Sequence, residues 1–86
     1  MKVTEKEVPM RFTIAGAVIE LTSEEVERRL VKVEPEEIRQ VFVEVRGKRY
    51  PVKQALAAAT PLIRSGFTTQ DANRVFRKLG FKLGEI

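Results

Sequence analysis

The sequence predicts a small α+β domain, in which short strands and short helices alternate along one chain. With 86 residues, 43% of them hydrophobic and 33% charged, the chain has the composition of one globular domain near the lower size limit for a core without covalent staples. We expect a single domain over residues 1–86, with residues 1–9 as a candidate flexible tail. Three observations predict the fold class: a β-branched stretch at 11–21, alternating valines at 41–45, and two threonine-led segments with helical spacing, at 22–33 and 68–79.

The first expected elements are a strand or small hairpin and then a helix. Residues 11–21 are rich in β-branched side chains, and Ala15-Gly16 marks a bend within them. Thr22 and Glu25 have the spacing of a capping box, so the helix is expected to begin at Thr22. The residues predicted to face the core from this region, including a hydrophobic staple at the helix start, are Leu21, Val26, Leu30 and Val33.

The middle of the chain predicts a short helical turn and a β-hairpin. Pro35 suits the first position of a short helical turn over Glu36 to Gln40. Residues 41–45 alternate as a half-buried strand does, and Gly47 supplies the positive φ that a tight turn needs. Residues 49–52 would return as the second strand, and because the proline among them cannot donate to a ladder, that strand lies at the edge of its sheet or ends there.

Two helices and a short strand are expected in the last third. The alanine-rich segment 53–60 predicts a helix that Pro61 ends, and Ser65-Gly66 marks a loop. Thr68 begins the last helix, with Asp71 at the capping-box position. A winged-helix-like arrangement is an alternative, because about eight connecting residues exceed the usual length of a helix-turn-helix loop. The predicted buried stripe is Ala72, Val75, Phe76 and Leu79, followed by a terminating Gly80 and a closing strand over 81–83.

The composition limits the chemistry that this chain can perform. The sequence has no histidine and no cysteine, so neither disulfides nor a zinc site is expected, and a cytoplasmic location is the simplest expectation. It has no glycine-rich phosphate-binding motif, so no cofactor is expected. Tyr50 and Lys53 have the spacing of some proton-transfer pairs, but without a cofactor motif we interpret both as structural and expect no enzyme.

Targeting and source can also be addressed from the composition. No apolar run approaches the length of a bilayer, so no membrane partner is expected. Residues 1–10 lack the apolar core of a signal peptide, so export is not expected. Asparagine and aspartate occur once each, which favours a thermophilic source.

Charge is distributed unevenly between the two halves of the sequence. Residues 46–86 contain nine basic and two acidic residues, a net charge of +7, whereas residues 1–45 carry −3. Positive charge gathered in one stretch is typical of a domain that binds a polyanion. The alternative is a solvated surface on a small soluble protein.

The basic residues fall in three predicted regions. The first is the hairpin turn, the second is the helix over 53–60 with the loop that follows it, and the third is the outer face of the last helix. Side chains at the turn can reach phosphates, and Gln70 and Asn73 are the candidates for contacts with base edges. The alternatives are ordinary solvation of a turn, protection of an edge strand and favourable interaction with a helix dipole. The candidate nucleic-acid-binding residues are Arg46, Lys48, Arg49, Lys53, Arg64, Gln70, Asn73, Arg74, Arg77 and Lys78.

Residues 21–83 resemble a small domain at the N-terminus of McrA-like HNH restriction endonucleases, the head domain, which also occurs in short stand-alone proteins. The most specific part of the resemblance is the cluster Gly47, Tyr50, Pro51 and Lys53, together with Leu79-Gly80-Phe81. The resemblance implies an accessory module in the restriction of modified DNA, and the chain lacks the HNH histidines. The matching segments are TSEEV (22–26), VEVRGKRYPVKQ (43–54), FTT (67–69) and RVFRKLGF (74–81).

Two functions remain open at this point. The first is a non-enzymatic nucleic-acid-binding module, with double-stranded DNA as the expected partner. The second is a protein-interaction or homodimerisation module whose basic half meets an acidic partner, which a patch containing Leu62 and Ile63 would support.

Overall fold

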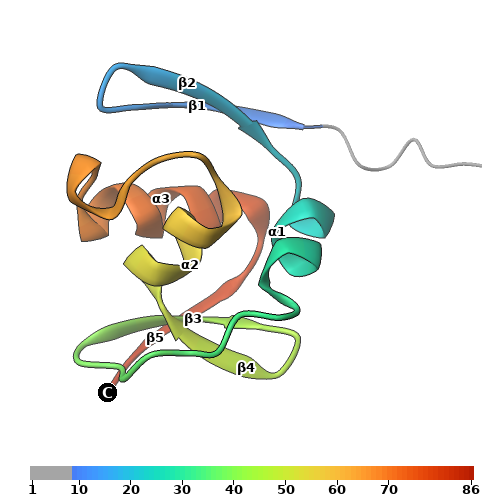
Figure 1. Ribbon diagram of the computed structural model, residues 1–86, viewed down its shortest axis with the longest axis vertical. Helices are drawn as coiled ribbons and strands as arrows, with labels where there is room; N and C mark the ends of the chain where they lie inside the picture. The colour runs from blue at the N-terminus through green and yellow to red at the C-terminus, as the bar shows by residue number, and fades with distance from the viewer. Residues whose placement is uncertain (1–8) are drawn as a thin grey trace, which may run out of the picture.

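The protein has three layers, with the helices packed between a two-stranded hairpin and a three-stranded sheet (Figure 1). The computed structural model describes residues 9–86, so the expected tail lies outside the described residues except for Pro9. The predicted α+β class is confirmed. The elements are β1 (Met10–Ile14), β2 (Ala17–Leu21), α1 (Ser23–Leu30), β3 (Val41–Val45), β4 (Lys48–Pro51), α2 (Val52–Ala59), the 3-10 turn η1 (Arg64–Gly66), α3 (Thr69–Leu79) and β5 (Lys82–Glu85).

The C-terminal strand completes the larger sheet. This sheet has the order β4-β3-β5, and both pairings are antiparallel. The central Phe42 lies opposite Pro51 on one side and Gly84 on the other. β4 is therefore an edge strand, as its proline predicts.

Both hairpins turn through two residues with positive φ. Ala15 and Gly16 have φ values of 53° and 84°, and Arg46 and Gly47 have φ values of 51° and 84°. Such paired left-handed residues match the right-handed twist of the flanking strands. The stretch 11–21 is thus a hairpin, and the predicted role of Gly47 is confirmed.

Both predicted capping threonines cap their helices, but only α3 has a complete capping box. The Thr68 hydroxyl accepts from the Asp71 N–H at 3.1 Å, and the Asp71 carboxylate accepts from the Thr68 N–H at 3.1 Å. At α1 the Thr22 hydroxyl accepts from the Glu25 N–H at 3.0 Å, but the Glu25 carboxylate pairs with Arg29 at 3.3 Å. The capping box of α1 is therefore half formed, because an i,i+4 ion pair competes for the carboxylate.

One apolar core joins all three layers. The predicted stripe of α3 is buried at Ala72, Val75 and Phe76, whereas Leu79 is partly exposed. Tyr50 is 2% exposed, and its hydroxyl donates to the Leu30 carbonyl at 3.0 Å, which satisfies a carbonyl in the last turn of α1. No helix within residues 9–86 is long and apolar enough to cross a bilayer.

The prediction of a helical turn over Glu36 to Gln40 is wrong. α1 ends at Leu30, so Val33 lies beyond the helix although it still packs against the core. The following segment is non-helical, because the side chain of Gln54 on α2 takes the place of its internal hydrogen bonds.

Gly84 provides a test of packing within the larger sheet. A Cβ atom at this position would lie 2.5 Å from Cζ of the buried Phe42 ring. We expect Gly84→Ala to lower the free energy of unfolding by about 1–3 kcal/mol through overpacking, measured by urea denaturation. Gly66→Ala is the matched control, since its Cβ would lie 3.4 Å from an Ile63 side-chain atom. Equal effects of the two substitutions would contradict the packing account.

Candidate nucleic-acid interface

Three of the nine basic residues of the C-terminal half are paired with carboxylates of the N-terminal half. Three arginines after position 45 each contact a glutamate before position 45. Folding therefore neutralises part of the difference in net charge between the two halves. Each pair is largely exposed and contributes little to stability. The pairs are Arg46–Glu27 at 3.5 Å, Arg49–Glu44 at 3.8 Å and Arg64–Glu36 at 2.9 Å.

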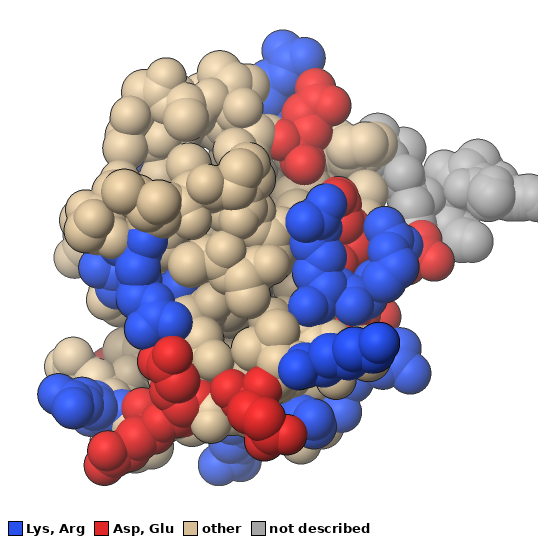
Figure 2. Space-filling view, in the orientation of Figure 1, with Lys and Arg blue, Asp and Glu red and all other residues tan. Residues whose placement is uncertain are grey.

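The turn of the β3–β4 hairpin lies against the end of α1. Arg46 and Lys48 border a hollow of about 150 Å³ together with Glu27 and Val31 of the α1 region. Figure 2 shows Lys and Arg side chains gathered on the side of the molecule where α1 and this turn lie. We call the exposed cations of these two segments that have no ion-pair partner within their own segment the basic edge; they are Arg28 and Lys32, at and just beyond the end of α1, and Arg46 and Lys48, at the turn.

Two members of the basic edge were missed from the sequence. Arg28 and Lys32 belong to the half of the chain with a net charge of −3, so the charge count drew attention away from them. The sequence signal for Arg28 is its position in the last turn of a helix whose first turn is acidic. Positive charge is thereby concentrated at the C-terminal end of the helix.

The outer face of α3 is only partly available to a partner. Gln70, Arg77 and Lys78 are exposed. Arg74 is engaged: it donates to the Thr13 carbonyl on β1 at 3.2 Å and lies 3.8 Å from Asp71. Arg74 therefore ties α3 to the N-terminal hairpin.

Asn73 is less accessible than its predicted role requires. Its side-chain oxygen is buried and has no hydrogen-bond partner among residues 9–86. Of the two residues predicted to contact bases, Gln70 is exposed and Asn73 is partly buried.

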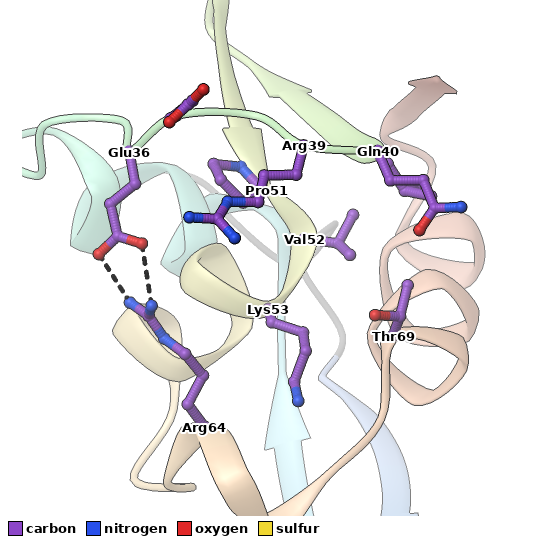
Figure 3. Close-up of a pocket in the computed structure, with 10 residues that line it drawn as sticks. Glu36, Arg39, Gln40, Pro51, Val52, Lys53, Arg64 and Thr69 are labelled. Atoms are coloured by element: carbon purple, nitrogen blue, oxygen red, sulfur yellow. Dashed lines mark hydrogen bonds and ion pairs between the residues drawn. The ribbon is translucent and has the colours of Figure 1, made fainter. Parts of the chain in front are cut away.

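Lys53 and Arg64 lie at the opposite end of β3 from the basic edge. They line a pocket of about 480 Å³ that also includes Arg39 and the first residue of β3, Val41 (Figure 3). Arg49 lies on β4 with its guanidinium 4.6 Å from the centre of the Phe42 ring. The ten predicted residues are thus distributed over the basic edge, β4, α3 and this pocket.

The Glu36–Arg64 pair is the best-formed ion pair of the described chain. Two parallel hydrogen bonds of 2.9 Å join the guanidinium to both carboxylate oxygens. These hydrogen bonds lower the pKa of Glu36 from its ordinary value and raise that of Arg64. Because the pKa of Glu36 is lower in the folded chain, this stabilising contribution is present above the ordinary carboxyl pKa and is lost as the pH falls through the folded value.

A buried amide holds the segment that carries Glu36. Gln54 is 7% exposed, its oxygen accepts from the Glu36 N–H at 2.9 Å, and its nitrogen donates to the Glu34 carbonyl at 2.9 Å. Both polar ends of the amide are therefore satisfied by a neighbouring stretch of backbone. This pairing fixes one wall of the pocket.

Comparison with known proteins assigns the chain to a family. The model of the SCO5918-like family matches residues 10–85. The chain belongs to the SCO5918-like family. No curated protein and no solved structure matched the chain. The family description names no ligand and no reaction, so the function of this SCO5918-like domain has to be argued from its surface.

Replacement of Gln54 tests the role of the buried amide. We expect Gln54→Met to cost about 1–3 kcal/mol in free energy of unfolding, because it leaves the Glu34 carbonyl and the Glu36 N–H without their partner. Hydrogen exchange at the Glu36 amide should accelerate in the same variant. Gln40→Met, at an exposed position, is the control. Unchanged exchange at Glu36 would show that the amide does not hold this segment.

Proposed function

We propose that this SCO5918-like domain is a non-enzymatic nucleic-acid-binding module that contacts double-stranded DNA through the basic edge. The observation that carries the proposal is the meeting of cations from the end of α1 with cations from the β3–β4 turn on one side of the molecule (Figure 2). Cations from separate segments on one surface provide a field that attracts a phosphate backbone.

The ion pairs of the described chain leave most of this surface free for a partner. Arg28, Lys32 and Lys48 have no carboxylate within 4.0 Å among residues 9–86. Arg46 is paired with Glu27 at 3.5 Å, but its side chain is 65% exposed, so a phosphate can compete with the glutamate at small cost. Binding of this kind depends mainly on charge and is weakly selective for sequence.

The restriction-associated role implied by the resemblance to McrA-like head domains stays a prediction. It is compatible with a module that contacts DNA without cleaving it. Contact with phosphates requires no catalytic group, and the role proposed here includes none.

A second function is favoured by an uncharged surface on another part of the molecule. Between Gln54 and Gln70 the chain has one charged residue, Arg64, and Glu36 neutralises it. Ile63 is 70% exposed within this stretch, close in sequence to the partly buried Leu62. An uncharged surface with an exposed isoleucine supports a protein-interaction or homodimerisation role as the alternative.

DNA binding is tested by fluorescence anisotropy on a labelled mixed-sequence duplex at several salt concentrations. We expect binding that weakens steeply with salt, and a fall of about 1 in the log–log salt slope for Lys32→Gln and for Lys48→Gln. Arg11→Gln on β1 is the control of equal charge change, in the hairpin layer (Figure 1). Absence of binding at low salt would exclude the proposal, and an equal effect of the control would exclude the basic edge as its location.

Self-association is tested by light scattering across a range of protein concentrations. If the alternative holds, mass should rise with concentration, and Ile63→Asp should abolish the rise because a charge would have to be buried in the interface. Ile86→Asp is the matched control, since Ile86 is 73% exposed and Ile63 is 70% exposed. A monomeric mass at all concentrations would rule out homodimerisation.

A further inference from the structure

A second cationic site lies at the end of β3 that is remote from the basic edge. The pocket of about 480 Å³ is lined by the segment 36–41, the start of α2, Arg64 and the first residue of α3, Thr69. This volume is within the range of small-molecule sites, about 300–1,000 Å³. Its size and its residues are those of a site for a discrete ligand.

Two cations without a carboxylate partner face this space. Arg39 and Lys53 line the pocket, and neither has a carboxylate within 4.0 Å among the residues described. In Figure 3 the Arg39 side chain descends from the 36–40 segment and ends near Pro51, whereas the Lys53 side chain leaves the start of α2 in the direction away from that segment. The two residues come from segments that are separated by β3 and β4 in the sequence, and the fold places both on the lining of one pocket.

Lys53 is held in position by packing. It is half-buried, and its Nζ lies 5.6 Å from the centre of the Phe67 ring, which is 4% exposed. A cation over an aromatic face loses conformational freedom before any ligand arrives, so less entropy is lost on binding.

The pocket wall already binds one oxyanion of the chain itself. Arg64 holds both oxygens of Glu36 through its two terminal nitrogens, each at 2.9 Å. With these oxygens engaged, Glu36 contributes less repulsion toward a second anion than a free carboxylate would. Glu37 also lines the pocket and remains as an unpaired negative charge within the part of the chain that the structure describes.

Two uncharged donors reinforce the cations. The Thr69 side chain lines the pocket from the first turn of α3, and its hydroxyl can donate to an anion. Val52 and Lys53 begin α2, whose N-cap residue, Pro51, supplies no side-chain hydrogen bond to the first-turn N–H groups. The terminus of α2 adds a modest positive potential to a site defined by its side chains.

We propose that this pocket binds a small phosphorylated molecule, with Arg39 and Lys53 as cationic ligands from two sides of the pocket and Thr69 as a hydrogen-bond donor. The negative charge of Glu37 favours ligands that carry one phosphate together with hydroxyl groups over polyphosphates, because a hydroxyl can donate to the carboxylate and further phosphates would be repelled. The site is independent of DNA contact at the basic edge, which lies at the other end of β3.

Titration of the whole chain with ribose 5-phosphate, followed by ¹H–¹⁵N correlation spectra at constant ionic strength, tests the site. We expect saturable shifts at the amides of Arg39, Lys53, Gln54 and Thr69. Arg39→Gln and Lys53→Gln should each weaken binding about tenfold, the effect of losing one charge-assisted hydrogen bond. Pyrophosphate should bind the unmodified chain more weakly than ribose 5-phosphate, and Glu37→Gln should strengthen the binding of pyrophosphate.

Opposite effects of the Arg39 and Glu37 variants separate a site from general attraction to a basic protein. Arg11→Gln changes the net charge as Arg39→Gln does and lies on the β1–β2 hairpin, so it should leave the affinity unchanged. The proposal is overturned if shifts are spread over the whole surface, if the Arg11 and Arg39 variants weaken binding equally, or if Glu37→Gln has no effect on the binding of pyrophosphate. Tighter binding of pyrophosphate would overturn the ligand class assigned here. None of these outcomes affects duplex binding, which is measured separately.

Discussion

The buried amide of Gln54 is the contact on which the arrangement of this end of the domain depends. It joins α2 to the backbone of the connection between α1 and β3 by two hydrogen bonds of 2.9 Å. A connection that would otherwise need its own helical turn is thereby held in a non-helical path, with its donors and acceptors satisfied from outside. This path brings the Glu36 carboxylate to Arg64 and places Arg39 on the lining of the pocket that Lys53 also lines. The uncharged side chain of Gln54 thus determines the positions of the charged residues Glu36 and Arg39.

Local signals in the sequence predicted local structure well. The capping threonine of α3, the glycine of the β3–β4 turn and the edge proline of β4 each act within a few residues, so their effect can be read directly from the sequence. The pairing of β5 with β3 and the Gln54 contacts connect residues far apart in the chain, and no local pattern encodes them. The helical turn expected after Pro35 failed for this reason: its local preference was real, but a long-range hydrogen-bonding partner satisfied the backbone in another conformation.

The candidate site was harder to predict than the fold, because the net charge of a stretch of sequence does not show which of its charged residues form ion pairs in the folded chain. Glu27, Glu36 and Glu44 lie in the acidic half, yet each contacts an arginine of the basic half. Folding therefore neutralises part of the difference in net charge between the halves, and the cations of residues 9–86 that stay unpaired come from both halves. Arg28, Lys32 and Arg39 lie before residue 46, and the fold places Arg39 in one pocket with Lys53 and Arg64 of the basic half. Net charge predicted a class of partner, whereas contacts within the folded chain decide which cations any partner could reach.

The stretch from Gly47 to Gln54 connects the two cationic surfaces, and its residues have structural roles that can be stated individually. Gly47 takes a φ of 84° in the turn beside the basic edge, and Tyr50 ties that hairpin to the end of α1 through the Leu30 carbonyl. Pro51 ends the edge strand and precedes α2, after which Lys53 enters the pocket and Gln54 fixes its wall. Four of these residues, Gly47, Tyr50, Pro51 and Lys53, also belong to the predicted resemblance to McrA-like head domains. Because their contacts explain them as architecture, their presence does not identify a ligand, and any ligand must be established from Lys48 on one side and from Arg39 on the other.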